Sequence, residues 1–159
     1  MNELSTLDRA RKAYQPKLPP ALAKGADRVV ITTGAATEPV KDKEAIKLAF
    51  PNTYGMPLLS FAAGEPAGGE AKALKVGVVL SGGQAPGGHN VIAGIFDAIR
   101  AIHPESQVFG FTGGPGGLEH GKYEIITPEV MDAYRNTGGF DIIGSGRTKL
   151  ETTEQFDRC

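Results

Sequence analysis

The residues of this chain with the clearest chemical potential are a run of glycines and one arginine. The loop from Gly82 to Gly88 follows the apolar run from Val76 to Leu80 and precedes a stretch with apolar residues at helical spacing. A strand, a glycine loop and a helix in this order build an anion site, because the first N–H groups of a helix lack intrahelical partners and carry partial positive charge. Glycines let a phosphate approach these groups without obstruction. The loop therefore predicts a phosphate site.

Two familiar phosphate loops do not match this stretch. A dinucleotide fingerprint needs G-x-G-x-x-G and an acidic residue further along, and the loop lacks that spacing. A Walker loop needs a lysine where this chain has Gly88. The alternative interpretation is a tight strand-to-helix turn that binds nothing, although its glycines exceed what a turn requires.

Arg147 is the side chain best suited to hold a phosphate. It follows Gly144-Ser145-Gly146 at an expected strand end, where ligands collect in open α/β sheets. A guanidinium can hold two phosphate oxygens in a fixed fork. Its alternative role is a surface salt bridge. Lys149 could also contact phosphate, or could be a solvated charge.

Motifs in the same order along the chain resemble those of the phosphofructokinases. The form Gly-Gly-Gln-Ala-Pro-Gly-Gly-His-Asn, from Gly82 to Asn90, resembles the opening loop of the long pyrophosphate-dependent members. Phe111–Leu118 resembles the second glycine loop of the family, and Gly138–Thr152 resembles the third motif, which carries an arginine. Phe50–Pro57 resembles the N-terminal extension of the long type. The resemblance covers most of the 159 residues.

This resemblance implies phosphoryl transfer from pyrophosphate to fructose 6-phosphate, giving fructose 1,6-bisphosphate in a reversible step of glycolysis. Gly83 would contact the donor phosphate, and Arg147 would be the catalytic residue on the transferred phosphoryl group. Gln84, where ATP-dependent relatives usually carry Asp, favours pyrophosphate as the donor. The donor side would be lined by Gly82, Gly83, Gln84, Gly87, Gly88, Arg147 and Lys149.

Three alternatives to this function stay open. The chain could be a non-catalytic regulatory subunit of the same family, an ATP-dependent phosphofructokinase, or an unrelated phosphate-binding α/β module. Family members use Mg²⁺ on the phosphates, but their metal-binding aspartates and catalytic base lie beyond the residues matched here. The resemblance therefore implies Mg²⁺ ligands outside this chain and no activity of the chain alone.

The histidines and the cysteine form no convincing site by their spacing. His89 stands at a helix start, where a polar residue is expected, and a ligand or acid/base role is its alternative. His103 and His120 lie beside turn residues and are expected to be solvated. No spacing of His, Cys and acidic residues suggests a metal site within the chain.

The fold expected from these patterns is α/β, with a partial doubly wound parallel sheet of the phosphofructokinase type. The apolar run 76–80 and the segment 107–112 should be parallel strands joined by a helix over 89–102. Ile142 and Ile143 should seed a third strand, and 122–126 should form a short edge strand. A helix beginning at Thr127-Pro128 should stop at Gly138. The last helix begins within 150–159, with Thr152 as a candidate cap and Gln155 three residues on. It has no strand after it, which predicts a truncated chain.

Two regions are expected along the chain. Residues 1–74 should be an N-terminal helical and loop extension with a linker, and residues 75–159 an incomplete phosphate-donor-binding α/β domain. In the extension, Ser5 should cap a helix that runs to Tyr14. Asp42 should cap a second helix that stops before Pro51. Short strands are expected at 28–33 and 58–61.

Composition excludes several classes of partner. Of the residues, 40% are hydrophobic and 22% charged, and the net charge of −1 gives no general attraction to nucleic acid or anionic membranes. No apolar run approaches the roughly 18 residues needed to span a bilayer. The single cysteine, Cys159, excludes an intrachain disulfide and suits a reducing compartment. We expect a cytoplasmic protein, and the resemblance implies a homo- or hetero-oligomer.

Overall fold

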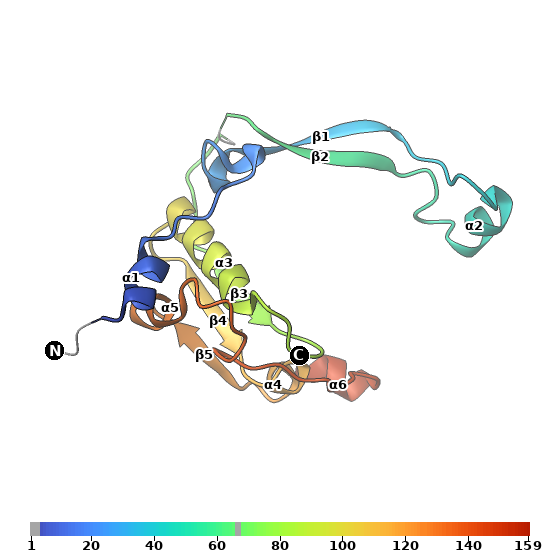
Figure 1. Cartoon of the computed structure of the whole chain (residues 1–159). Coiled ribbons are helices and arrows are strands. Elements are labelled where there is room, and N and C mark those ends of the chain that lie inside the picture. The colour runs from blue at the N-terminus through green and yellow to red at the C-terminus, as the bar shows by residue number, and fades with distance from the viewer. Residues whose placement is uncertain (1–3, 66–67) are drawn as a thin grey trace. The chain divides into compact units, whose positions relative to one another are not determined.

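The computed structural model of this protein describes residues 4–65 and 68–159 (Figure 1). The chain divides into two compact units, one formed by Leu18–Gly68 and the other by Met1–Lys17 together with Gly69–Cys159. The beginning of the chain therefore belongs to the unit that contains the glycine loops. The sequence-based boundary between residues 74 and 75 stays a prediction.

The glycine-loop unit is built on a three-stranded mixed sheet. Its order is β3 (Lys75–Val79), β4 (Gln107–Phe111) and β5 (Tyr123–Ile126). Strands β3 and β4 are parallel, and β5 runs antiparallel to β4 at the edge. The parallel pair requires a crossover, which α3 (Gly88–Ile102) provides across the sheet (Figure 1). The α/β class and the edge strand are confirmed, but the sheet of the described residues is mixed and not parallel throughout.

The prediction of a third parallel strand at Ile142 and Ile143 is wrong. These residues lie in a turn, and the parallel bridge that follows them, between Gly146 and Ser81, lies beyond the end of β3 and outside the strands of the sheet. The turn ends in the left-handed conformation of Gly144, with a φ of 63° that interrupts extended backbone. Both isoleucines are buried in the core. Their apolar character thus reflects core packing and not strand pairing.

The core of this unit lies between α3 and the sheet. Helix α3 buries Ile92, Phe96 and Ile99, which recur on one face of the helix at the expected spacing. Val91, which precedes Ile92 in the same helix, is exposed. The remaining buried apolar residues come from α3 itself, the strands, α5 (Pro128–Tyr134) and the turn before Gly144: Val78, Ala93, Val108, Ile126, Met131, Ile142 and Ile143.

The first helix and the helix after β5 begin at the capping residues expected. In α1 (Thr6–Ala13), the Ser5 hydroxyl accepts a hydrogen bond from the Asp8 N–H at 3.1 Å. In α5 (Pro128–Tyr134), the Thr127 hydroxyl accepts one from the N–H of Val130. Helix α5 ends before Gly138, because Arg135 leaves helical geometry with a ψ of 130° and Asn136 then takes a left-handed φ of 58°.

Two short helices complete the unit. Helix α4 (Pro115–Glu119) follows β4, and α6 (Thr153–Arg158) lies near the end of the chain. A capping box between Thr152 and Gln155 starts α6, as the sequence predicts. No helix among the described residues is long and apolar enough to cross a membrane.

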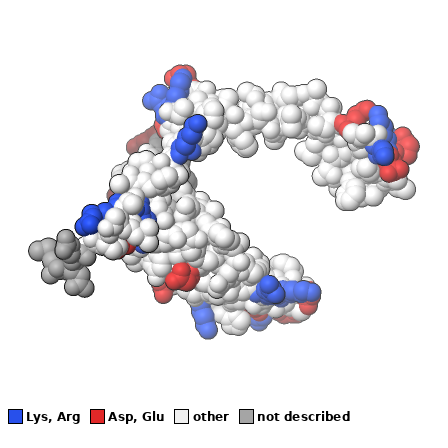
Figure 2. Space-filling model, in the orientation of Figure 1, with Lys and Arg blue, Asp and Glu red and all other residues white. Residues whose placement is uncertain are grey.

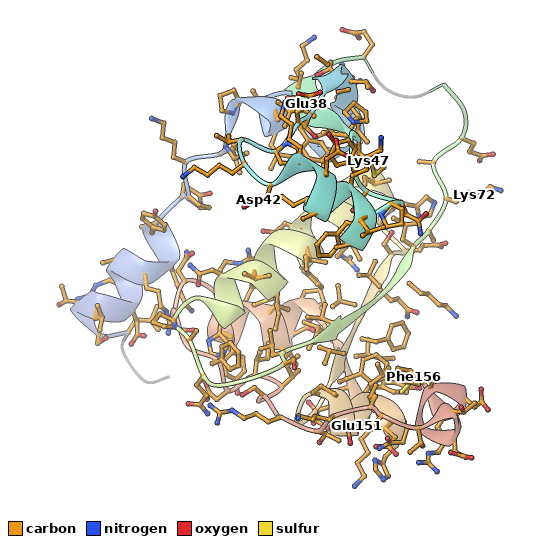
Figure 3. The ribbon with its side chains drawn as sticks, turned by 90° about the vertical axis from the view of Figure 1, so that its right-hand side faces the viewer. Glu38, Asp42, Lys47, Lys72, Glu151 and Phe156 are labelled. Atoms are coloured by element: carbon orange, nitrogen blue, oxygen red, sulfur yellow. The ribbon has the colours of Figure 1, made fainter. Side chains whose placement is uncertain are left out.

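The other unit is an antiparallel hairpin of β1 (Val29–Ala36) and β2 (Pro57–Ala63). Two short 3-10 helices, Pro20–Leu22 and Ala26–Arg28, precede it, and α2 (Lys43–Ala49) lies in the connection between its strands. Asp42 precedes α2 as predicted, but its side chain makes no capping bond. Its φ of 53° is left-handed, whereas a capping residue is normally extended. Figure 3 shows Asp42 with Glu38 and Lys47 around this helix.

The hairpin unit has no buried side chains among its described residues. Apolar side chains on its strands are largely exposed, and the view in Figure 2 shows few charges along the hairpin. An isolated two-stranded hairpin is marginally stable in water. The large apolar residues that are exposed on the two strands are Ile31, Leu58, Leu59 and Phe61.

Candidate phosphate site

Three glycine segments far apart in the sequence meet where β3 and β4 end. Gly82 donates its backbone N–H to the carbonyl of Gly146 at 2.9 Å. Gly113 donates its N–H to the carbonyl of Ile143 at 2.8 Å. The bridge from Ser81 to Gly146 fixes the third segment beside the first. The carboxyl ends of the two parallel strands thus carry all three family-like motifs.

Close backbone contacts explain why glycine occupies these positions. A Cβ on Gly114 would lie 2.8 Å from the Cα of Gly146 and 2.9 Å from the carbonyl oxygen of Leu80. Cβ atoms essentially never approach other atoms below 3.0 Å, so any side chain here would push the segments apart. Gly114 also has a φ of 77°. This glycine therefore permits the first, second and third loops to pack together.

Arg147 lies beside the first glycine loop. A Cβ built on Gly83 would lie 2.9 Å from Nη2 of Arg147. Arg147 is exposed, and its guanidinium forms no ion pair with any carboxylate of the described residues. The structure therefore brings these two predicted site residues together. The surface salt bridge considered as the alternative for Arg147 is not formed within the described part of the chain.

The backbone N–H groups of the loop are only partly available. The N–H of Gly82 is used on Gly146, and that of Gly87 donates to the carbonyl of Gly138 at 2.8 Å. Within residues 4–65 and 68–159, no acceptor receives the N–H groups of Gly83, Gln84, Ala85 and Gly88. The N–H groups of Gly82 and Gly87 are therefore not available to a ligand, because they hold the third motif in place.

Gly88 is buried by an aromatic ring. A Cβ on Gly88 would lie 2.9 Å from Cε2 of Phe140 and closer still to Cδ2. The structure therefore packs the first residue of α3 against the third motif. Gly87 precedes the helix with a φ of 96°, a conformation that glycine adopts without steric cost.

Gln84 and Lys149 are the remaining predicted site residues. Both are exposed, and Gln84 stands in the loop immediately after Gly83. The carbonyl of Lys149 accepts a hydrogen bond from Nε2 of Gln155 at 3.4 Å, which ties its backbone to α6. The structure gives no contact of the Lys149 ammonium with the loop.

His89 is the residue whose part in this region the sequence did not reveal. It is 1% exposed, and its Nδ1 lies 2.5 Å from Oγ1 of Thr137. Its Nε2 accepts the N–H of Ile142 at 3.0 Å. Burial lowers the pKa of His89, and the Asp141 carboxylate opposes that effect only in part. In the sequence, His89 stood out only as a polar residue next to apolar ones at the start of the helix. That pattern does not indicate that its ring bonds to Thr137 and Ile142.

A second buried polar residue holds the last helix. Glu119 is 7% exposed and accepts a hydrogen bond from Nη2 of Arg158 at 2.5 Å. That hydrogen bond lowers the pKa of Glu119. The pair joins α4 to α6, so the residues that follow Arg147 are tied back to the second glycine motif.

The other candidate groups of the sequence do not gather at the loops. His103 accepts from the N–H of Glu105, and Nδ1 of His120 lies 2.8 Å from the carbonyl oxygen of Gly116. Cys159 is exposed with a free thiol. Among the described residues, no group of three or more His, Cys, Asp or Glu side chains could hold a metal ion.

A separate hollow of about 370 Å³ lies next to α1 in the same unit. Apart from Asn90, the last residue of the first motif, its lining residues lie outside the three motifs: Leu7, Asp8, Arg11, Tyr14, Asn136 and Thr137. The candidate site at the strand ends is therefore separate from this hollow.

Exposed N–H groups beside a guanidinium can bind phosphoryl oxygens, because both donate to a fixed position and oppose negative charge. This chain is an α/β protein with a glycine loop between a parallel strand and a helix, the position where α/β folds commonly bind phosphate.

Comparison with known proteins identifies the family. No family model matches the chain. It is 57% identical over 153 residues to a protein of Porphyromonas gingivalis named pyrophosphate–fructose 6-phosphate 1-phosphotransferase, covering 96% of this chain and 27% of that protein. A protein of the same name from Treponema pallidum is 47% identical over 161 residues, covering 96% and 28%. The beta subunit named for this activity in Solanum tuberosum is 49% identical over 131 residues, covering 81% and 23%.

These matches confirm the resemblance drawn from the motifs. The chain belongs to the pyrophosphate-dependent phosphofructokinase family and corresponds to the N-terminal part of its relatives. It spans about 27% of the length of the first of them.

Proposed function

We propose that this chain carries the pyrophosphate-binding part of an enzyme that transfers a phosphoryl group to fructose 6-phosphate, giving fructose 1,6-bisphosphate in a reversible step of glycolysis. The observation that carries this proposal is the position of Arg147 beside Gly83 in a loop with unused N–H groups. The names of the relatives support the choice of donor and acceptor.

Phosphoryl transfer depends mainly on positioning and on neutralising charge at the phosphate oxygens. The N–H groups of Gly83 and Gln84 would donate to pyrophosphate, and the Arg147 fork would hold two oxygens of the transferred phosphoryl group. The neutral amide of Gln84 adds no negative charge next to the donor, which suits pyrophosphate. Lys149 would add long-range attraction, while Gly82, Gly87 and Gly88 would shape the loop.

The rest of the active site would lie outside this chain. The described residues lack a cluster that fits a metal ion, so Mg²⁺ would arrive with pyrophosphate and take its protein ligands elsewhere. The sugar-phosphate pocket and the catalytic base would also be supplied by further sequence, and the chain alone would be inactive. We also propose residues 75–159 as the incomplete donor domain of a larger doubly wound fold, in a cytoplasmic oligomer.

Binding of pyrophosphate to this chain tests the proposal. Isothermal titration calorimetry at low ionic strength would compare the wild type with Arg147→Gln and Lys72→Gln, which remove the same charge. Loss of a bidentate charge-assisted contact should weaken binding about tenfold in Arg147→Gln. Lys72 lies in the segment before β3 (Figure 3). Lys72→Gln should change the affinity for pyrophosphate by less than about twofold, as expected for an exposed charge.

Other outcomes select between the alternatives. Equal weakening by both substitutions would show general charge attraction and contradict a built site. Tighter binding of ATP than of pyrophosphate would favour an ATP-dependent enzyme. No binding of either would favour a regulatory subunit or a turn without a ligand. Turnover of pyrophosphate and fructose 6-phosphate by the isolated chain in a coupled assay would refute the proposed inactivity.

A further inference from the structure

We propose that His89 is a positioning residue: its imidazole holds the backbone of the third motif so that Arg147 stays beside Gly83. This inference rests on the proposed function of that pair. His89 would touch no substrate, because it is 1% exposed and both ring nitrogens have protein partners.

The hydrogen bonds define one orientation of the ring. The Thr137 hydroxyl donates to the carbonyl of Tyr134 at 2.6 Å, so its oxygen is left to accept from Nδ1–H of His89. Nε2 then carries a lone pair, which accepts the N–H of Ile142. This is a neutral imidazole with its single proton on Nδ1. The edge of the ring also meets Tyr134, at 4.8 Å between centroids.

The imidazole acts directly on the segment that leads to Arg147. Within the described residues, His89 is the only side chain that hydrogen-bonds to the backbone of 138–147. The remaining ties are backbone bonds, including the His89 N–H to the Gly139 carbonyl at 3.0 Å. A Cβ on Gly139 would lie 2.9 Å from Nδ1, so the ring and this backbone are in direct contact.

Protonation would reverse the contact with Ile142. A charged imidazole has N–H groups at both nitrogens and can no longer accept the Ile142 N–H. The charged and titratable groups that face the ring are Asp141, whose Oδ1 lies 3.1 Å from Nε2, and the phenol-bearing ring of Tyr134. The new N–H at Nε2 could donate a hydrogen bond to the Asp141 carboxylate. This would release the N–H of Ile142 and the backbone after it.

Two substitutions separate the ring's contacts. His89→Gln places an amide oxygen near the Nε2 position and can restore an acceptor for Ile142. His89→Asn reaches only the Nδ1 position and leaves the Ile142 N–H without a partner. His103→Asn is the matched control, because it removes a histidine from the other end of α3. Thr137→Val tests the Nδ1 contact if His89→Asn fails to fold.

The readouts are pyrophosphate affinity by calorimetry and, without any anion, the nuclear Overhauser effect between Gly83 and the Arg147 side chain. His89→Asn should weaken affinity about tenfold, as expected for loss of a buried hydrogen bond, and should weaken the Overhauser effect. His89→Gln should recover most of both, and His103→Asn should match the wild type. Lowering the pH through the titration of His89, followed by its ring resonances, should weaken the Overhauser effect in the wild type. The same change of pH should leave the Overhauser effect unchanged in His89→Gln.

Retention of affinity and of the Overhauser effect in a folded His89→Asn would overturn the inference. So would equal losses in His89→Gln and His89→Asn, because a purely structural role would not depend on the restored acceptor. If wild type binds no pyrophosphate, the proposed function fails, while the Overhauser effect still decides whether His89 positions Arg147.

Discussion

Nη2 of Arg147 lies so close to Gly83 that a methyl group on this glycine would come within 2.9 Å of it. The two residues belong to motifs more than sixty positions apart in the sequence. Their proximity places a main-chain donor beside a bidentate side-chain donor, and such a pair can hold phosphate oxygens.

Gly83→Ala tests this proximity. The φ of Gly83 lies outside the left-handed region, so alanine should fit the backbone while its methyl group displaces the guanidinium. We expect pyrophosphate affinity to fall about tenfold, through loss of a charge-assisted contact, with little change in melting temperature. Gly94→Ala is the control, because this exposed helical glycine has open space around it. Unchanged affinity in Gly83→Ala would contradict the assigned site.

Ile92→Ala tests the core that supports the loops. Ile92 is completely buried, and removing its branched side chain should lower the free energy of unfolding by about 2–5 kcal/mol. The neighbouring Val91 is 57% exposed, so Val91→Ala should change the free energy of unfolding by only about 0.5 kcal/mol. Urea denaturation followed by circular dichroism measures both. Similar losses would show that α3 does not pack as described.

The pH dependence of stability should carry the signature of His89. Burial lowers its pKa in the folded state, so the unfolded state binds more protons as the pH falls. The contribution of the neutral ring is therefore fully present above the unfolded pKa of about 6.5 and is lost as the pH falls through the folded pKa. Urea titrations between pH 8 and pH 5 should show a smaller decline for His89→Gln, which does not titrate. Equal declines would exclude His89 as the source.

Glu119→Gln should release α6. The carboxylate accepts from Arg158, and this hydrogen bond lowers the pKa of Glu119, so the attachment should hold at neutral pH and weaken as the pH falls through that lowered pKa. Amide hydrogen exchange in α6 should become faster in Glu119→Gln at neutral pH. Asp157→Asn removes the same charge from an exposed residue of α6 and should leave exchange unchanged. Faster exchange in both variants would indicate loss of helix charge and not of the contact.

Local patterns predicted the elements of the fold well where a short stretch decides the outcome. The caps of α1, α5 and α6 were predicted because a hydroxyl and an N–H two or three residues later meet through local geometry alone. The same rule failed at Asp42, where the backbone took a left-handed φ. The apolar pair at Ile142 and Ile143 was misassigned, since burial in a turn and burial in a strand leave the same composition.

The amino-acid sequence by itself determined the family, the strand–loop–helix order and the candidate residues, because these depend on local spacing and on motif resemblance. Only the tertiary structure decided which backbone N–H groups of the loop are used, that Arg147 reaches Gly83, and that His89 binds the backbone of Ile142. These are contacts between segments distant in the sequence. They depend on how the strand ends pack together, and no local pattern of residues specifies that packing.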